Sequence, residues 1–285
     1  MNKLSSNILT ACLWEVTARK AGNVHRFADF DNLTYLDFIQ SAAAIAPVLE
    51  QRFNLPLGIT ILEAIRATRS VVQTNTNLGI VLLLTPLATS RGQISHDELN
   101  SVLDASTVDD ANHVYEAIRL AVPGGLGKVE TQDVAEAPTH TLREVMALAA
   151  DRDLIARQYE NGFREVLDEG VPALMRAWDR FQSVEAAILH AQLHLLSRFP
   201  DSLIVRKRGI ADAEQVMRQA QEIDLGSAEG RQRYAIFDRW LRADGHSRNP
   251  GTTADLLAAC LFVALQENRM NLSMPFTWTE FVSCV

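Results

Sequence analysis

The strongest constraint in this 285-residue sequence is that its patterned segments share the period of an α-helix. Between residues 4 and 19, for example, Ile8, Cys12 and Val16 recur every four positions and so fall on one helical face. No segment alternates apolar and polar residues as a half-exposed strand does, and no two-residue hairpin signal occurs. We therefore predict an all-α fold, with helices at residues 4–19, 34–53, 59–73, 80–89, 96–105, 109–121, 142–169, 172–181, 184–198, 211–222, 227–243 and 252–268.

The domain organisation follows from what is missing between these helices. The chain contains no Pro-, Gly- or Ser-rich linker and no internal repeat. Its length fits one large domain, and a hydrophobic fraction of 47% is ample for one sizeable core. We predict that residues 1–285 form a single multi-helix bundle in which interhelical loops form a polar cleft.

Charge and cysteine content limit the partners and the compartment. Lys and Arg total 27 against 35 Asp and Glu, a net charge of −8, which argues against a nucleic-acid or anionic-membrane surface. The longest apolar runs, such as Ile80–Leu84, are too short to span a membrane, and the N-terminus lacks the apolar core of a signal peptide. The three cysteines form no CxxC pair, and Cys12 and Cys260 lie in apolar helical patterns. We expect buried thiols and a cytoplasmic protein.

Polar loops between the predicted helices are the candidate sites for chemistry. The sequence contains no HExxH zinc motif, no GxGxxG turn after a strand, no Walker GxxxxGK[ST] loop and no GxSxG nucleophile elbow. It therefore offers none of the common zinc-hydrolase, nucleotide-fold or serine-hydrolase signatures. The polar clusters are Glu15 with residues 20–31, residues 74–79, residues 124–133, residues 201–208 and residues 244–255.

Residues 74–79, Thr-Asn-Thr-Asn-Leu-Gly, join two apolar segments and have two interpretations. They can form a turn whose Asn or Thr side chain caps the next helix. Alternatively, the helix N-terminus can hold a phosphate, because its dipole and free N–H groups attract negative charge. Capping is the commoner role on local grounds, whereas the place of the stretch in an ordered series of polar loops favours a ligand-facing helix N-terminus.

Two later loops and the acidic residues also have alternative interpretations. Arg206 and Lys207 belong to a basic run that suits either a polyphosphate contact or cations at a solvated helix end. Thr252 and Asp255 have the spacing of a capping box, which explains them as well as metal binding does. The preceding small and polar residues suit a phosphate cradle. Candidate Mg²⁺ ligands, none of them specific as a pair, are Asp29, Asp31, Glu130 and Asp133.

In their order along the chain, these clusters resemble the motifs of the triphosphoribosyl-dephospho-coenzyme A synthase family from about Glu15 to Leu265. Each motif is short, and the resemblance depends on their order and spacing. The matching motifs are Glu15-Val16 with Lys20-Ala21-Gly22-Asn23-Val24, Asp29-Phe30-Asp31, Phe38 through Ser41 to Pro47, Thr74 to Gly79, Asp201-Ser202-Leu203 with Arg206-Lys207, and Pro250 to Ala258.

The resemblance implies an all-α transferase. Enzymes of that family move the 5-triphosphoribosyl group of ATP to the 2′-hydroxyl of dephospho-coenzyme A and release adenine. Their product is the precursor of the prosthetic group of citrate or malonate decarboxylase acyl carrier proteins. For this chain the resemblance implies ATP as a substrate with Mg²⁺ and a hydroxyl acceptor as partners, and it leaves a homo-oligomer open.

The chain also departs from the family pattern. Ala21 replaces a proline, Asn77-Leu78 replaces His-Lys, and residues 124–130 lack the family's arginine. With these changes the chain resembles a divergent branch of the family. That branch is linked to tetrahydromethanopterin-dependent one-carbon metabolism, and its acceptor can differ from dephospho-coenzyme A. Two alternatives therefore stand beside the transferase. One is a nucleotide-binding protein with altered catalysis, and the other is a different ATP-using enzyme, such as a phosphotransferase acting on a pterin precursor.

Displacement at the anomeric carbon of ATP needs a base, a cationic clamp for the triphosphate, and groups that stabilise an oxocarbenium-like state. We predict Glu15 or Asp31 as the base. Predicted metal ligands are Asp29, Asp31, Glu130 and Asp255, the last of which can instead bind ribose. Predicted nucleotide- and phosphate-binding residues are Lys20, Gly22, Asn23, Asn75, Thr76, Asn77, Gly79, Arg206, Lys207 and Arg248.

Overall fold

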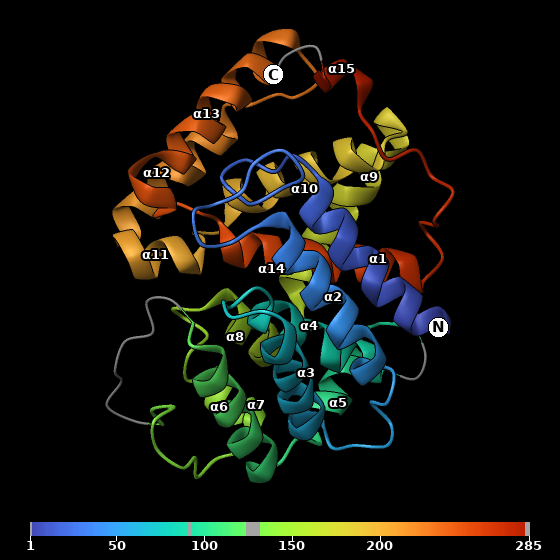
Figure 1. Cartoon of the computed structure of the whole chain (residues 1–285), viewed down its shortest axis with the longest axis vertical. Helices are drawn as coiled ribbons and strands as arrows, with labels where there is room; N and C mark the ends of the chain where they lie inside the picture. The colour runs from blue at the N-terminus through green and yellow to red at the C-terminus, as the bar shows by residue number, and fades with distance from the viewer. Residues whose placement is uncertain (1, 91–92, 124–131, 283–285) are drawn as a thin grey trace.

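The computed structural model describes residues 2–90, 93–123 and 132–282, and over these residues the fold is all-α, as predicted (Figure 1). Outside the helices, the described chain forms only two isolated β-bridges, His25 with Ala28 and Phe30 with Leu33. In chain order, the elements are α1 (Lys3–Thr17), α2 (Tyr35–Leu49), α3 (Leu57–Val71), α4 (Leu78–Thr89), α5 (His96–Asp104), α6 (Val108–Ala121), α7 (Leu142–Ala147), α8 (Leu154–Asn161), the π-helix η1 (Glu165–Gly170), α9 (Val171–Phe181), α10 (Val184–Arg198), α11 (Ser202–Arg208), α12 (Ile210–Gln221), α13 (Ala228–His246), α14 (Gly251–Gln266) and α15 (Thr279–Val282).

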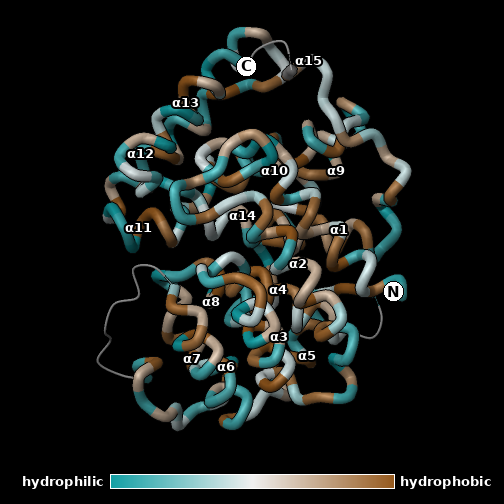
Figure 2. The backbone as a smooth tube through the Cα atoms, in the orientation of Figure 1, coloured by the Kyte–Doolittle hydropathy of each residue, from teal (hydrophilic) through white to brown (hydrophobic). Residues whose placement is uncertain are grey.

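Helix α14 lies at the centre of the molecule and packs against helices from both halves of the chain. Its residues from Leu256 to Leu265 are buried on every side, as expected of a helix that is apolar all round. It packs against α1, α4, α9, α10 and η1, so it connects the two halves of the chain (Figure 1). Figure 2 shows the hydrophobic residues concentrated on these inner helices, with hydrophilic residues on the outer ones.

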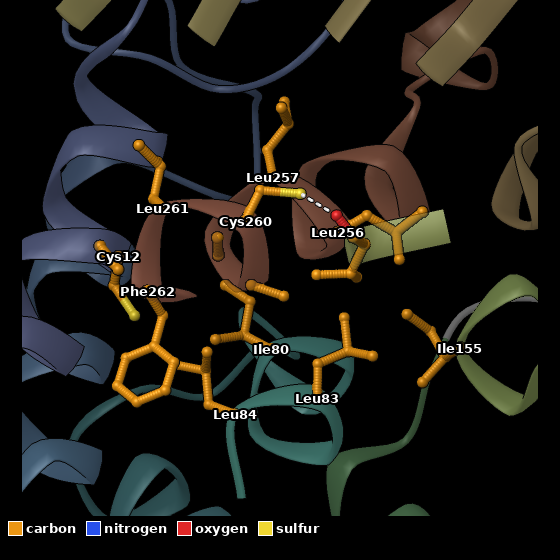
Figure 3. Close-up of a cluster of buried hydrophobic side chains, with 14 of the residues drawn as sticks. Cys12, Ile80, Leu83, Leu84, Ile155, Leu256, Leu257, Cys260, Leu261 and Phe262 are labelled. Atoms are coloured by element: carbon orange, nitrogen blue, oxygen red, sulfur yellow. Dashed lines mark hydrogen bonds between the residues drawn. The ribbon is translucent and has the colours of Figure 1, made fainter. Parts of the chain in front are cut away.

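The contact between α14 and α4 positions the site. Leu256 and Phe262 of α14 lie on the side of the helix that faces Ile80, Leu83 and Leu84 of α4, whereas Leu257 and Leu261 point to its other side (Figure 3). Cys12 of α1 and Ile155 of α8 belong to the same cluster. Cys12 and Cys260 are buried free thiols, as predicted, and burial raises the pKa of both. The first turns of α4 and α14 also meet, because the Asp255 carboxylate lies against Gly79.

Several predicted helix boundaries are wrong for identifiable reasons. The single helix expected at 142–169 is three elements, because Asp153 caps a new helix at Leu154 and Gly162, with φ of 73°, ends it. Residues 202–208, predicted to be a loop, form α11, whose first N–H groups are capped by the Asp201 carboxylate. Helix α13 continues to His246 across a kink at residues 243–245.

A buried ion cluster joins the C-terminal segment to the core. Glu185, fully buried on α10, accepts hydrogen bonds from Arg19 Nε at 2.8 Å and Arg19 Nη2 at 2.7 Å, and it pairs with Arg26 at 3.2 Å. The Trp278 N–H also donates to Glu185, at 3.3 Å. Each oxygen of this carboxylate is therefore satisfied by a donor. Across the described residues, no helix combines the length and the apolar character that a membrane span requires.

Candidate functional site

A cleft of about 1320 Å³ opens where the N-terminal ends of α4, α8 and α14 meet α11. Residues 30–33 and the turn after α13 complete its polar side, and residues from α6 and α7 extend it on the other side. The volume exceeds the roughly 300–1,000 Å³ of typical small-molecule sites. The cleft therefore has room for a large ligand or for two ligands together.

Glu15 lies on the floor of the cleft and is held by Lys20. The Lys20 ammonium is 2.9 Å from Glu15 Oε1 and donates to the Glu15 backbone carbonyl at 2.5 Å. Burial raises the pKa of Glu15, an effect that Lys20 opposes, and burial lowers the pKa of Lys20. Lys20 is completely buried and does not line the cleft, so its ammonium serves Glu15 rather than a ligand phosphate.

Asp255 is the second carboxylate on the floor. A Cβ added at Gly79 would overlap the Asp255 carboxylate, so only glycine allows this approach. Among the described residues, Asp255 has no hydrogen-bond or ion-pair partner. Burial raises the pKa of Asp255 well above its ordinary value, and the nearby charge of Glu15 adds to the effect. The capping box expected from Thr252 and Asp255 is wrong: the N-cap is Pro250 and no side chain caps α14, which leaves Asp255 free to face the cleft.

The stretch from Thr74 to Gly79 lines the cleft and combines its two predicted interpretations. Asn75 Oδ1 accepts a hydrogen bond from the Leu78 N–H at 3.1 Å, as a helix cap does. Thr76 and Asn77 are buried and bond to Ser41 and Thr68, which fixes the loop. The first turn of α4 nevertheless faces the cleft, so its N-terminus is available to a ligand.

The upper wall of the cleft comes from α11. Asp201 caps α11 through Oδ1, and its Oδ2 accepts from the Thr253 N–H at 2.7 Å, which ties the start of α11 to the start of α14. Arg206 pairs with Asp153 at 2.6 Å and lines the cleft beside Lys207. Burial and the charge of Arg206 lower the pKa of Lys207. The basic run predicted to contact phosphate is thus both a helix end and part of the cleft wall.

Four predicted residues lie elsewhere. Besides Lys20, the residues that do not line the cleft are Gly22, Asp29 and Arg248. The Gly22 N–H donates to Asp238, Asp29 accepts from the Tyr35 N–H at 2.6 Å, and Arg248 pairs with Asp244 at 2.8 Å. Each of these groups is therefore occupied in holding the loops around the site.

Asn23 and Glu130 are two further residues that the sequence predicted as part of the site. Asn23 lines the cleft, but its side chain bonds to Asn249, Pro250 and Gln192, so it supports the site from behind. Glu130 lies outside the described residues. Within the described part of the chain, no group of three or more His, Cys, Asp or Glu side chains is arranged to hold a metal ion. Of the candidate magnesium ligands, Asp31, Asp133 and Asp255 line the cleft.

Several residues that line the cleft were not predicted from the sequence. Asp153 and Arg152 line it from the turn before α8, and the apparent continuity of the 142–169 pattern concealed that turn. A capping aspartate before the apolar pair Leu154-Ile155 is the local signal that could have revealed it. Phe30 and His246 also line the cleft and stack on each other, with ring centroids 3.9 Å apart. Their pairing carries no sequence signal, because it joins loops more than two hundred residues apart.

Comparison with known proteins adds an independent finding. The model of the CitG family, described as ATP:dephospho-CoA triphosphoribosyl transferase, matches residues 1–274. A curated relative from Pseudomonas savastanoi pv. phaseolicola, named "Probable 2-(5''-triphosphoribosyl)-3'-dephosphocoenzyme-A synthase", is 30% identical over 190 residues, which span 63% of this chain and 62% of the relative. A relative of the same name from Vibrio cholerae is 28% identical over 255 residues, spanning 78% of this chain and 74% of the relative.

A solved structure shares the fold. The structure titled "Crystal structure of putative triphosphoribosyl-dephospho-coA synthase from Archaeoglobus fulgidus" superposes with a TM-score of 0.65 at 30% identity. The match covers 80% of this chain and 97% of that chain. The sequence and structural comparisons therefore agree with each other and with the resemblance seen in the motifs.

Proposed function

Because the chain belongs to the ATP:dephospho-CoA triphosphoribosyl transferase family, we propose that it transfers the 5-triphosphoribosyl group of ATP to a hydroxyl of dephospho-CoA and releases adenine. The observation that carries this proposal is the pair of carboxylates on the floor of the cleft, buried Glu15 and half-buried Asp255, with basic residues on the cleft wall. Paired carboxylates in unlike environments suit a reaction that moves protons at two atoms.

The chemistry assigns a role to each carboxylate. The bond from the ribose C1′ of ATP to adenine breaks, a bond from C1′ to the acceptor oxygen forms, and the hydroxyl proton goes to a base. Of the two predicted bases, Glu15 fits better, because Lys20 fixes it on the floor whereas Asp31 lies exposed on the rim. Asp255, whose pKa is raised by burial and by the charge of Glu15, is the carboxyl group that can donate a proton to the departing adenine or to the ribose.

The triphosphate needs positive charge, which two elements of the cleft supply. Arg206 and Lys207 lie on the wall formed by α11, and the N-terminus of α4 contributes the positive end of a helix dipole. Lys207 has no hydrogen-bond or ion-pair partner within the described part of the chain. Its ammonium can therefore turn toward phosphate without breaking an existing pair.

Magnesium belongs to the proposal as a companion of ATP. Mg²⁺ usually takes one or two protein carboxylates and completes its shell with water and phosphate oxygens. Asp31 lines the cleft where it could hold such an ion, and the ion would offset triphosphate charge. Asp255 could bind the ion only as a carboxylate, in place of its role as proton donor. This expectation needs no preformed metal cluster in the protein.

Incubation of the purified protein with ATP, Mg²⁺ and dephospho-CoA, followed by chromatography of the bases, tests the proposal. We expect free adenine in stoichiometric amount with a triphosphoribosylated acceptor, and none when dephospho-CoA is omitted. Release of phosphate or AMP without adenine would rule out glycosyl transfer and favour a phosphotransferase.

The altered-catalysis alternative is supported by one feature of the cleft. Leu78 lines it and Asn77 is bonded to Thr68, so the start of α4 offers neither an imidazole nor an ammonium group. This alternative predicts that isothermal titration calorimetry detects ATP binding while no acceptor gives adenine. Release of adenine by the wild-type protein excludes it.

A further inference from the structure

One side of the cleft is apolar and is not used by the roles assigned above. Tyr115 and Ile118 of α6, Val134, Val145 and Met146 of α7, and Ala149 line it together, and we call this set the α6–α7 arm. Ile155 and Ala156 of α8 connect the arm to the polar floor within the same cavity. In Figure 1, α6 and α7 lie below α11 in the lower part of the view, so the arm extends away from the proposed triphosphate wall.

The polar groups of the arm are already satisfied. The Tyr115 hydroxyl donates to the Gln132 carbonyl at 2.7 Å, so the residue presents its ring to the cavity. Burial and the nearby charge of Asp133 raise the pKa of Tyr115, and Asp133 also lines the cavity. The Arg152 guanidinium donates to the Leu148 carbonyl at 3.1 Å, which places it next to Ala149, and Arg152 lines the cleft. The arm therefore offers an apolar trough with the cation of Arg152 and the carboxylate of Asp133 beside it.

We propose that the α6–α7 arm binds the pantetheine portion of the acceptor and that Arg152 contacts the acceptor's diphosphate. The inference rests on the proposed function, which brings ATP and dephospho-CoA into one cavity. A cleft of about 1320 Å³ is larger than one nucleotide requires, and its surplus is lined by apolar side chains. The polar floor, Arg152 and the apolar arm follow one another along the cavity. Dephospho-CoA fits this order, because its reacting ribose would lie at the floor, its diphosphate near Arg152 and its long, mainly apolar chain along the arm.

The alanines at 149 and 147 provide a matched pair of test positions. Ala149 lines the arm, whereas Ala147, on the same short stretch, is exposed and does not line the cleft. A phenylalanine at 149 fills the arm, and a phenylalanine at 147 adds the same bulk to the surface. Binding is measured by calorimetry with an ATP analogue saturating the donor site, using dephospho-CoA and, as the probe without pantetheine, ADP.

The wild type should bind dephospho-CoA at least about tenfold more tightly than ADP. Ala149→Phe should remove that preference and leave the Kd for ADP unchanged, and Ala147→Phe should keep the wild-type preference. Equal binding of both probes by the wild type, or an unchanged preference in Ala149→Phe, would overturn the inference. If Ala149→Phe does not fold, as judged by circular dichroism, Ile118→Ser should weaken the same preference by opening and polarising the arm.

The binding test does not depend on turnover, so the two proposals fail separately. Arm-dependent binding of dephospho-CoA without adenine release would reject the transfer reaction and retain the arm. Adenine release together with a dephospho-CoA affinity that Ala149→Phe does not change would support the reaction and reject the arm as the binding site.

Discussion

Glu185 is a fully buried carboxylate and Asp255 is a half-buried carboxylate beside the cleft, and the groups around them differ in kind. Glu185 is surrounded by donors from Arg19, Arg26 and Trp278, whereas Asp255 has no hydrogen-bond or ion-pair partner among the described residues. Burial raises the pKa of Glu185, but the hydrogen bonds and charge of Arg19 and the charge of Arg26 outweigh burial, so the pKa is lowered. The pKa of Asp255 is raised, because burial and Glu15 act in the same direction.

The difference separates structural from functional burial of charge. A carboxylate whose oxygens are all satisfied holds segments together, as Glu185 holds the C-terminal segment against α1 and α10. A carboxylate left unpaired beside a cleft carries a cost that folding alone does not explain, and such sites are candidates for catalysis or binding. Burial by itself raises the pKa of both carboxylates, so burial alone does not distinguish their roles.

The largest expected effect is the loss of stability in Glu185→Ala. Removing the carboxylate leaves Arg19 buried without its partner, which should lower the free energy of unfolding by about 3–5 kcal/mol. Urea denaturation followed by circular dichroism measures it. The control is Glu229→Ala, which removes an exposed pair with Arg233 and should cost less than about 1 kcal/mol. Equal losses in the two variants would contradict a structural role for the Glu185 cluster.

Asp255→Asn should show the opposite pattern. The amide keeps the shape but removes the proton donor, so kcat for adenine release should fall by about 100-fold or more. The free energy of unfolding should not fall by more than about 1 kcal/mol, because no partner is lost. Asp168→Asn, on the surface beside His96, is the control and should leave kcat unchanged. A large loss of stability in Asp255→Asn would place Asp255 with Glu185 as a structural group.

Gly79→Ala tests the close approach that positions Asp255. The added methyl group would overlap the carboxylate, so we expect a cost of about 1–3 kcal/mol in unfolding free energy. In an Asp255→Ala background the same change should cost much less, because the obstructing group is gone. A double-mutant cycle by denaturation measures the coupling, and additive effects would show that the two residues do not constrain each other.

The two carboxylates should also give opposite pH dependences. The stability that neutral Asp255 contributes is complete below its ordinary pKa of 3.8 and is lost as pH rises toward its raised folded-state pKa. Asp255→Asn should therefore gain stability relative to the wild type as pH increases above about 3.8. Glu185→Gln should lose most above 4.5, and its loss should shrink as pH falls through the lowered pKa. Denaturation curves from pH 3 to 8 that change in the same direction would refute the contrast.

The smallest expected effect concerns two neighbouring cations of α11, Lys207 and Arg208. Lys207 lines the cleft, whereas Arg208 pairs with Asp212 and does not line it. Lys207→Ala should raise the KM for ATP by roughly threefold to tenfold, about 1 kcal/mol, with kcat nearly unchanged. Arg208→Ala should leave the KM near the wild-type value. Steady-state kinetics at fixed ionic strength decides the comparison, and equal changes would remove Lys207 from the triphosphate site.

Much of the fold was predictable because it depends on local pattern. The helix expected at 184–198 is α10 with the same bounds, since Ser183 caps it and its apolar residues repeat at helical spacing. The errors at 148–153 and 202–208 arose where one polar residue decides a boundary. Asp153 starts α8 and Asp201 starts α11 by capping, and a single side chain is a weak signal against a long apolar pattern.

The candidate site was predictable in part. The motif order pointed to Glu15, Asn75, Lys207 and Asp255, all of which line the cleft. The motif order could not indicate that Lys20 pairs with Glu15 and that Asp29 accepts from the Tyr35 N–H. The direction of a loop side chain depends on neighbours that are far away in sequence. Asp153 and the α6–α7 arm were missed for the same reason, since an apolar helix face looks alike whether it packs against protein or lines a cavity.

The sequence by itself determined the all-α architecture, the buried thiols and the family to which the chain belongs, because helical period and motif order are written along the chain. Only the tertiary structure decided which charges are satisfied. Glu185 and Asp255 are each one acidic residue in a helix when read in sequence. Their pKa values move in opposite directions because Arg19, Arg26 and Trp278 converge on Glu185, whereas burial and the charge of Glu15 act together on Asp255.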